Sequence, residues 1–80
     1  MRIRDSQQIG AALRQARKRQ GLTQAQLAEK AGLRQHTISL VEGGKPYTQI
    51  RVIFAMMAAL GLDATLVDRA DTTPDLEDLF

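Results

Sequence analysis

The stretch from Leu22 to Gly44, LTQAQLAEKAGLRQHTISLVEGG, constrains the fold of this chain more than any other. Thr23 is a favourable helix N-cap, and Gln26 three residues later completes the spacing of a capping box, so a helix is predicted to start there. Gly32 stands where that helix must stop, because glycine accepts left-handed backbone at little steric cost. The inward face of this first helix is formed by Leu27, Ala28 and Ala31.

A second helix is predicted over residues 35–42, with Ile38 and Val41 three positions apart on its buried side. Leu33 is expected to pack under the turn that joins the two helices. The small residues Ala28 and Gly32 allow a close crossing at the steep angle of a helix-turn-helix. In that motif the second helix lies in the DNA major groove, so the pattern indicates DNA binding.

Three segments extend the pattern from Ile9 to Leu60: IGAALRQARKRQGLTQAQLAEKAG, HTISLVEGGK and IFAMMAALGL. This run resembles the Cro/cI-type (XRE) helix-turn-helix domains. With the later segment LDATLV the chain is most similar to the HipB-type antitoxin repressors of bacteria. The resemblance implies an all-α, lambda-repressor-like domain of four to five helices with a C-terminal β-strand that pairs across a dimer. It also implies two partners, double-stranded operator DNA and a HipA-like serine/threonine kinase toxin.

Length and composition exclude several other classes. Eighty residues make one small domain, the absence of cysteine excludes disulfides and thiolate metal sites, and a single histidine argues against a zinc site. No nucleophile–base set or phosphate loop is visible, so we expect neither an enzyme nor a cofactor. Arg2, Arg4 and Asp5 interrupt any leader-like apolar run, and residues 52–60 fall short of the roughly 20 residues of a membrane span. The expected location is the cytoplasm.

Charge is distributed unevenly along the chain. Residues 1–60 carry ten basic and three acidic side chains, whereas residues 61–80 carry one basic and six acidic ones. A basic surface alone is more often solvated than functional, but beside a helix-turn-helix pattern it favours a polyanionic partner.

The N-terminal part is divided into a short basic arm, residues 1–5, and the helix-turn-helix domain, residues 6–61. Ser6 is predicted to cap a helix that runs to about Arg19, before Gly21. The buried stripe of this helix has helical spacing: Ile9, Ala12, Leu13 and Ala16. Cations at its C-terminal half also favour the helix dipole: Arg14, Arg17, Lys18 and Arg19.

The exposed side of the predicted recognition helix carries side chains that can contact DNA. Gln35 can form a bidentate pair with adenine, Arg34 can reach guanine or a phosphate, and Leu40 can pack on a thymine methyl or be a stray exposed apolar residue. His36 can donate to a base or phosphate, and Ser39 completes this face. Families of this type often have Ser or Thr where Arg34 stands and a polar residue where Leu40 stands. An Arg34 side chain cannot accept the capping bond.

Flanking residues are candidates for the DNA backbone. The resemblance implies that Gln24, at the start of the first motif helix, binds a phosphate, helped by the helix-end amides. Thr37 has two open roles, a phosphate contact or packing on the preceding helix, and Lys45 is a phosphate candidate in the glycine-rich loop. The resemblance further implies an ion pair between Arg17 and Glu42, with two independent surface charges as the alternative.

The last predicted helix, residues 49–60 with Thr48 as its cap, is apolar on all sides. One side is assigned to the core: Ile50, Ile53, Phe54, Met57 and Leu60. The other side is assigned to a homodimer interface, because an 80-residue monomer cannot cover both sides of the helix: Val52, Ala55, Met56 and Ala59.

Residues 62–70 are predicted to be a dimerisation strand, since Leu62, Ala64 and Leu66 alternate with Asp63, Thr65 and Val67. A lone strand needs a partner, which the same strand of a second subunit would supply. The alternative is an irregular extension on the chain's own core.

Residues 71–80, DTTPDLEDLF, read as an acidic flexible tail. Its apolar residues Leu76, Leu79 and Phe80 suggest docking on a partner, which the resemblance identifies with the kinase toxin; a frayed terminus without a role is the alternative.

The leading hypothesis is therefore a dimeric, sequence-specific repressor that acts as a type II antitoxin. It would autoregulate its operon and neutralise a HipA-like kinase. A stand-alone phage-type or metabolic repressor without a toxin remains open, as does a protein-interaction adaptor that kept the fold without binding DNA.

Overall fold

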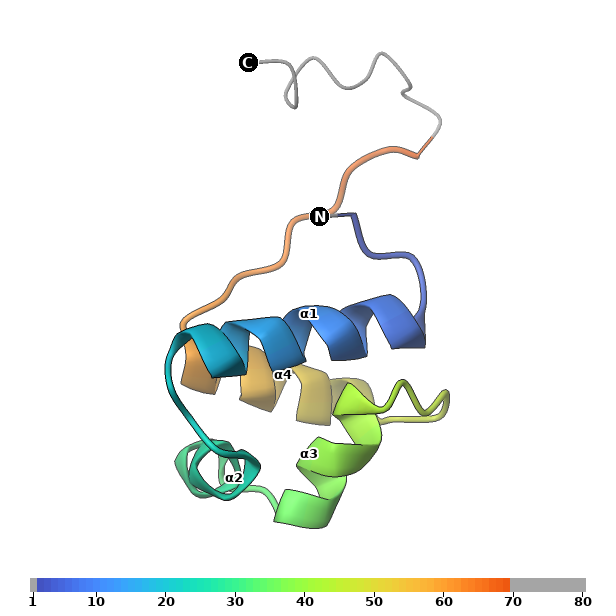
Figure 1. The fold of residues 1–80 in the computed structure, drawn as a ribbon. Coiled ribbons are helices and arrows are strands. Elements are labelled where there is room, and N and C mark those ends of the chain that lie inside the picture. Colours follow the sequence, from blue (N-terminus) through green and yellow to red (C-terminus); the bar gives the residue numbers. More distant parts are fainter. Residues whose placement is uncertain (1, 70–80) are drawn as a thin grey trace.

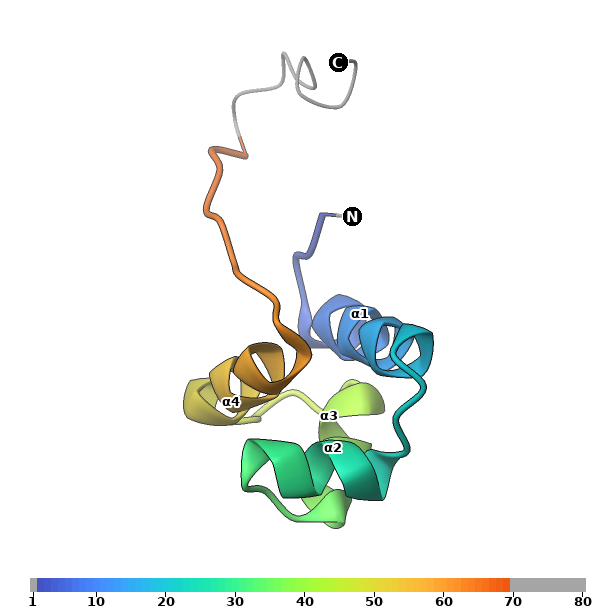
Figure 2. The ribbon, with the colours of Figure 1, turned by 90° about the vertical axis from the view of Figure 1, so that its left-hand side faces the viewer.

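Residues 2–69 are described by the computed structural model, and their regular secondary structure consists of four helices. The helices are α1 (Ser6–Arg19), α2 (Gln24–Ala31), α3 (Gln35–Glu42) and α4 (Ile50–Leu60). In Figures 1 and 2, α1 and α4 lie side by side, and α2 and α3 cross beneath them. The arm before α1 and the segment after α4 both leave from the side opposite α2 and α3. The prediction of an all-helical, helix-turn-helix domain is confirmed.

The start of α1 differs by one residue from the prediction. Asp5, and not Ser6, is the N-cap: its Oδ1 accepts a hydrogen bond from the Gln8 backbone N–H at 2.8 Å. Ser6 already belongs to the helix, and its hydroxyl donates to the Gly44 carbonyl at 3.2 Å. The carboxylate of an extended residue reaches the third helical amide, so Asp5 performs the capping. Ser6 instead ties α1 to the loop after α3.

The start of α2 and the turn between α2 and α3 both have the geometry that the sequence predicts. Thr23 accepts from the Gln26 N–H at 3.0 Å, and the Gln26 side chain accepts from the Thr23 N–H at 2.9 Å. This reciprocal pair completes the capping box. Gly32 adopts the left-handed conformation at φ 71°, and the Leu33 N–H closes the turn on the Ala28 carbonyl at 2.8 Å.

Each helix contributes one fully buried large side chain to the core: Leu13, Leu27, Ile38 and Met56. Around them, Ile9 and Leu33 are partly buried and pack on the same cluster. The crossing of α1 and α3 depends on Gly10, because a Cβ there would lie 2.2 Å from the Val41 carbonyl oxygen. The core therefore requires glycine at a position where the sequence alone shows only an interruption of an apolar stripe.

The predicted faces of α4 were wrong in part, although Ile53 packs against the core as expected. Val52 and Met56, assigned to the dimer interface, are 7% and 0% exposed and belong to the core. Ile50 and Phe54, assigned to the core, are 69% and 52% exposed. Met57 and Leu60 are buried as expected, while Ala55 and Ala59 are partly buried. Every residue of α4 except the exposed Arg51 is apolar, so the two sides of the helix differ little in polarity, and packing against α1 and α2 selects the inner one.

The start of α4 also corrects the prediction, because Thr48 does not cap it. Its hydroxyl donates to the Lys45 carbonyl at 3.2 Å, within the loop. Gln49 occupies the N-cap position without a side-chain capping bond, and the helix starts at Ile50.

Residues 62–69 form neither helix nor strand in this single chain. Leu62 packs against the core and its N–H bonds the Met57 carbonyl at 2.8 Å, but Ala64 is exposed and Leu66 is 97% exposed. The segment runs away from the helices (Figure 1). A strand needs a hydrogen-bonding neighbour, which one chain does not offer here. Residue 70 and the tail 71–80, with Leu76, Leu79 and Phe80, lie outside the described residues. Among the described helices, none has the length and apolarity to cross a membrane.

Candidate nucleic-acid interface

Helix α3 presents a polar face on the outside of the domain while its inner face is fixed in the core. Ile38 and Val41 are 0% and 2% exposed, which sets the rotation of the helix about its axis. The side chains of the opposite face are exposed, as predicted for a recognition helix: Gln35, His36, Ser39 and Leu40, preceded by Arg34. Thr37 is half-buried at the edge of this face.

Arg34 stands at the N-cap of α3 and makes no side-chain capping bond. An Arg guanidinium has only donors, so it cannot accept from the helix amides, as its identity predicts. The guanidinium is exposed, and it therefore remains available to a base edge or phosphate beside Gln35 and His36.

A buried ion pair holds α3 against α1. Arg17 Nε donates to Glu42 Oε2 at 2.7 Å and Arg17 Nη2 donates to Glu42 Oε1 at 2.9 Å, in a bidentate arrangement. The two side chains are 9% and 3% exposed. Arg17 Nη1 also donates to the Leu22 carbonyl at 2.8 Å, which ties in the connection between α1 and α2. The structure thus contains the Arg17–Glu42 pair and not two independent surface charges.

The electrostatics of this pair follow from its hydrogen bonds. The hydrogen bond to Glu42 raises the pKa of Arg17 above its ordinary value, and the nearby charge of Glu42 acts in the same direction against the opposing effect of burial. A raised pKa favours the charged guanidinium in the folded state. Arg17 therefore serves as a permanently charged brace that fixes the C-terminal end of α3.

Gln24 is not a freely exposed side chain, as a simple phosphate contact would be. It is the first residue of α2 and is half-buried, and its Nε2 donates to Glu42 Oε1 at 3.1 Å. The side chain predicted to contact the DNA backbone is thus connected to the end of the recognition helix.

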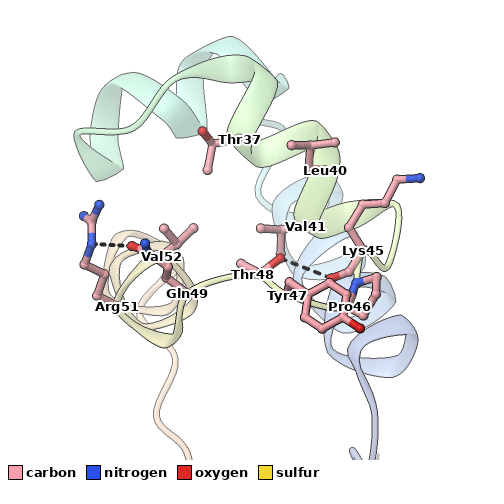
Figure 3. A pocket seen from close by; sticks show the side chains of 10 residues that line it. All are labelled: Thr37, Leu40, Val41, Lys45, Pro46, Tyr47, Thr48, Gln49, Arg51 and Val52. Carbon is pink, nitrogen blue, oxygen red and sulfur yellow. Dashed lines mark hydrogen bonds between the residues drawn. The ribbon is translucent and has the colours of Figure 1, made fainter.

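A recess of about 570 Å³ lies between α3, the following loop and the start of α4 (Figure 3). Three predicted DNA-contacting residues line it, namely Thr37, Leu40 and Lys45. The sequence-based selection missed Tyr47 and Arg51, which line the same recess. Tyr47 is 99% exposed, and the Arg51 Nε donates to Gln49 Oε1 at 2.8 Å. A cation and an aromatic residue close behind Lys45 were the signal that could have identified them.

The described residues contain no group of three or more metal-ligating side chains. The polar side chains on and around the exposed face of α3 carry amides, hydroxyls, cations and one imidazole. These groups suit hydrogen bonding to base edges and phosphates. Four short helices, a capped turn and a braced, polar outer helix together define a helix-turn-helix protein of the DNA-binding type.

Comparison of the sequence with known proteins supports this assignment to the helix-turn-helix class. A family model described as a helix-turn-helix domain matches residues 8–70. Antitoxin HipB of Escherichia coli (strain K12) is 34% identical over 68 residues, which span 85% of this chain and 77% of HipB. Antitoxin HipB of Escherichia coli O6:H1 (strain CFT073) is likewise 34% identical over 68 residues, spanning 72% of its length.

Solved structures of HipB complexes also have the same fold as this chain. A HipB–O4 20mer complex and a HipA–HipB–O2–O3 complex each match with a TM-score of 0.81 at 33% identity, over 86% of this chain and 97% of the matched chain. The chain belongs to the HipB antitoxin family of helix-turn-helix regulators.

Proposed function

We propose that this protein is a sequence-specific DNA-binding repressor that acts as a HipB-type antitoxin, repressing its own operon and neutralising a HipA-like serine/threonine kinase toxin. The observation that carries the DNA-binding part is the orientation of α3. Two apolar residues and the buried Arg17–Glu42 pair fix its inner face, and the opposite face stays exposed, with Gln35, His36, Ser39 and Leu40. The family relationship supports the antitoxin role.

In this proposal the exposed face of α3 enters the major groove, and the protein makes two kinds of contact, one with base edges and one with the DNA backbone. Gln35, His36 and Ser39 contact base edges, with Arg34 and Leu40 at the ends of the same face. The half-buried Thr37 and Gln24 and the exposed Lys45 contact the backbone. Basic side chains make the affinity salt-dependent, and base contacts make it sequence-dependent.

Repression requires two copies, since a pseudo-palindromic operator presents successive major grooves about 34 Å apart on one face of the duplex. The dimer face is proposed to include Ile50 and Phe54, which share one side of α4 and are exposed in the single chain. Ala64 and Leu66 are exposed in residues 62–69, which would gain a hydrogen-bonding partner by forming a two-stranded ribbon with a second copy.

The kinase partner is proposed from the family, with support from the solved complex that contains both HipA and HipB. The apolar residues Leu76, Leu79 and Phe80 of the acidic tail are proposed as one contact with it. Removing Thr73 to Phe80 is expected to spare DNA binding and weaken capture of the kinase. Equal capture by the truncated chain would remove the tail from this proposal.

The DNA-binding part is tested with the duplex directly upstream of the chain's own coding sequence and a scrambled duplex of equal length, at physiological salt. The unsubstituted chain is expected to prefer its upstream duplex. Gln35→Ala with Ser39→Ala is expected to abolish that preference while weak, salt-sensitive binding to both duplexes remains. An unchanged preference would contradict the groove assignment, and no specific complex at all would favour the adaptor.

Copurification with the product of the neighbouring reading frame separates an antitoxin from a stand-alone repressor. A kinase-like protein retained by this chain, and inactive while bound, is the expected result. Specific DNA binding without any kinase-like neighbour would leave only the repressor.

A further inference from the structure

Glu42 contacts two different side chains, and only one of them belongs to the brace between α1 and α3. Its Oε1 accepts from Arg17 Nη2 at 2.9 Å and from Gln24 Nε2 at 3.1 Å. The last residue of α3 therefore holds the first side chain of α2. The Glu42 side chain is 3% exposed, so its oxygens are aimed into the protein and at these partners.

The chemistry of this contact fixes the orientation of the Gln24 amide. An ionised carboxylate accepts hydrogen bonds and does not donate them, so the amide nitrogen, and not the oxygen, must face Glu42. A primary amide nitrogen carries two hydrogens, and Glu42 uses one of them. The second N–H stays on the same fixed nitrogen, and a phosphate oxygen is also purely an acceptor.

We propose that Glu42 is a positioning residue for DNA binding, which holds the Gln24 amide so that its second N–H donates to a phosphate of the operator. This inference rests on the proposed DNA-binding function. It links the two helices of the motif: the residue that ends the recognition helix sets the donor with which α2 contacts the backbone. Arg17 supports the arrangement by donating to both oxygens of the same carboxylate.

The test is a double-mutant cycle in operator affinity, measured by fluorescence anisotropy with the upstream duplex. Arg17→Met with Glu42→Met removes the acceptor of Gln24 without leaving a buried charge, an exchange that is often neutral for stability. This pair is made with Gln24 intact and with Gln24→Ala. Thermal unfolding of all four proteins shows that each is folded at the assay temperature.

A positioning role predicts a dependence on background. With Gln24 intact, the methionine pair is expected to weaken binding about fivefold, the effect of one net hydrogen bond. With Gln24→Ala, the same pair is expected to cause no further loss. Equal losses in both backgrounds, or a Gln24→Ala variant that binds as well as the unsubstituted chain, would overturn the inference. Absence of operator binding by the unsubstituted chain would instead refute the proposed function.

A second measurement applies even if the methionine pair does not fold. The two side-chain amide hydrogens of Gln24 are followed by NMR in the unsubstituted chain as the duplex is added. One hydrogen is expected to keep its slow exchange with water, because Glu42 retains it, while the resonance of the other shifts. Loss of protection at both hydrogens on DNA binding would show that Gln24 leaves Glu42, and it would overturn the inference.

Discussion

Helices α2 and α3 bury the large apolar side chains they carry, apart from Leu40 at 38% exposure. By contrast, α4 and residues 62–69 leave Ile50, Phe54 and Leu66 largely exposed. The first region also has its turn capped and its end braced within one chain. The second ends in residues 62–69, which have no regular secondary structure.

This difference indicates that α2 and α3 serve DNA recognition in the proposed function, whereas α4 and residues 62–69 serve assembly with a second copy. The proposed recognition surface is held in place within a single chain, because α3 packs against α1 and α2 of the same molecule. The apolar surface at the other end is unsatisfied in one chain, and water contact with such surface is unfavourable. A second copy of the chain is expected to cover the exposed apolar residues of α4 and residues 62–69 without changing the structure of α2 and α3. Four substitutions test this contrast.

The largest effect is expected at the brace of the complete region. Arg17→Met leaves the Glu42 carboxylate buried without its cation, and the loss of stability is expected to be about 3–5 kcal/mol. Arg17→Met with Glu42→Met is expected to regain most of it, since neither charge is then left alone. Urea unfolding measures both variants. If the single and double variants were equally destabilised, the pair would not act as a unit.

Phe54→Asp probes the incomplete region. A charge placed in the proposed apolar subunit contact is expected to weaken dimerisation by about 2 kcal/mol or more, and sedimentation velocity is expected to show monomers. The helical fold is expected to persist, because the side chain is half exposed in the single chain. Gln15→Asp, on the exposed side of α1, is the control. An intact Phe54→Asp dimer would place the subunit contact elsewhere.

Gly10→Ala tests the close crossing of α1 and α3. The added Cβ would lie 2.2 Å from the Val41 carbonyl oxygen, so the helices must separate. A loss of about 1–3 kcal/mol in the free energy of unfolding is expected, as for overpacked cores. Ala11→Val adds volume at the next, exposed position and is expected to change little. Similar melting temperatures for the two variants would show that the crossing tolerates a larger spacing.

The smallest effect concerns Arg34, where stability and recognition are expected to oppose each other. Arg34→Ser supplies the missing side-chain cap of α3 and is expected to stabilise the fold by about 1 kcal/mol. It also removes a cation from the proposed DNA-binding face, so operator binding is expected to weaken. Arg34→Ala removes the cation without adding a cap and serves as control. Equal stability of the serine and alanine variants would show that α3 gains nothing from a cap.

Much of the recognition region could be predicted from local chemistry. Thr23 and Gln26 face each other within one turn, and Gly32 supplies the left-handed residue, so the capping box and turn depend on neighbouring residues only. Ile38 and Val41 are three positions apart on α3, where Leu40 is the one other apolar residue, and their spacing identifies the inner face. The exposed positions from Gln35 to Leu40 follow from the same periodicity.

The errors arose where the local signal was absent or ambiguous. Asp5 and Ser6 are both good caps, and the backbone conformation decides between them. Thr48 looked like a cap until the loop used its hydroxyl. Tyr47 and Arg51 follow closely after Lys45 in the sequence, but only the fold shows that α3, the next loop and the start of α4 enclose one recess lined by all three.

The sequence by itself determined the helix-turn-helix, its caps and its exposed polar face, because these depend on residues within one or two turns of each other. Only the tertiary structure decided which side of α4 is buried, that Gly10 permits the approach of α1 to α3, and that Glu42 holds Gln24 as well as Arg17. These features depend on contacts between helices. The spacing of apolar residues cannot show such contacts when almost every residue of a helix is apolar, as in α4. It also cannot show them when the partner is a backbone atom far away in the sequence, as Val41 is from Gly10.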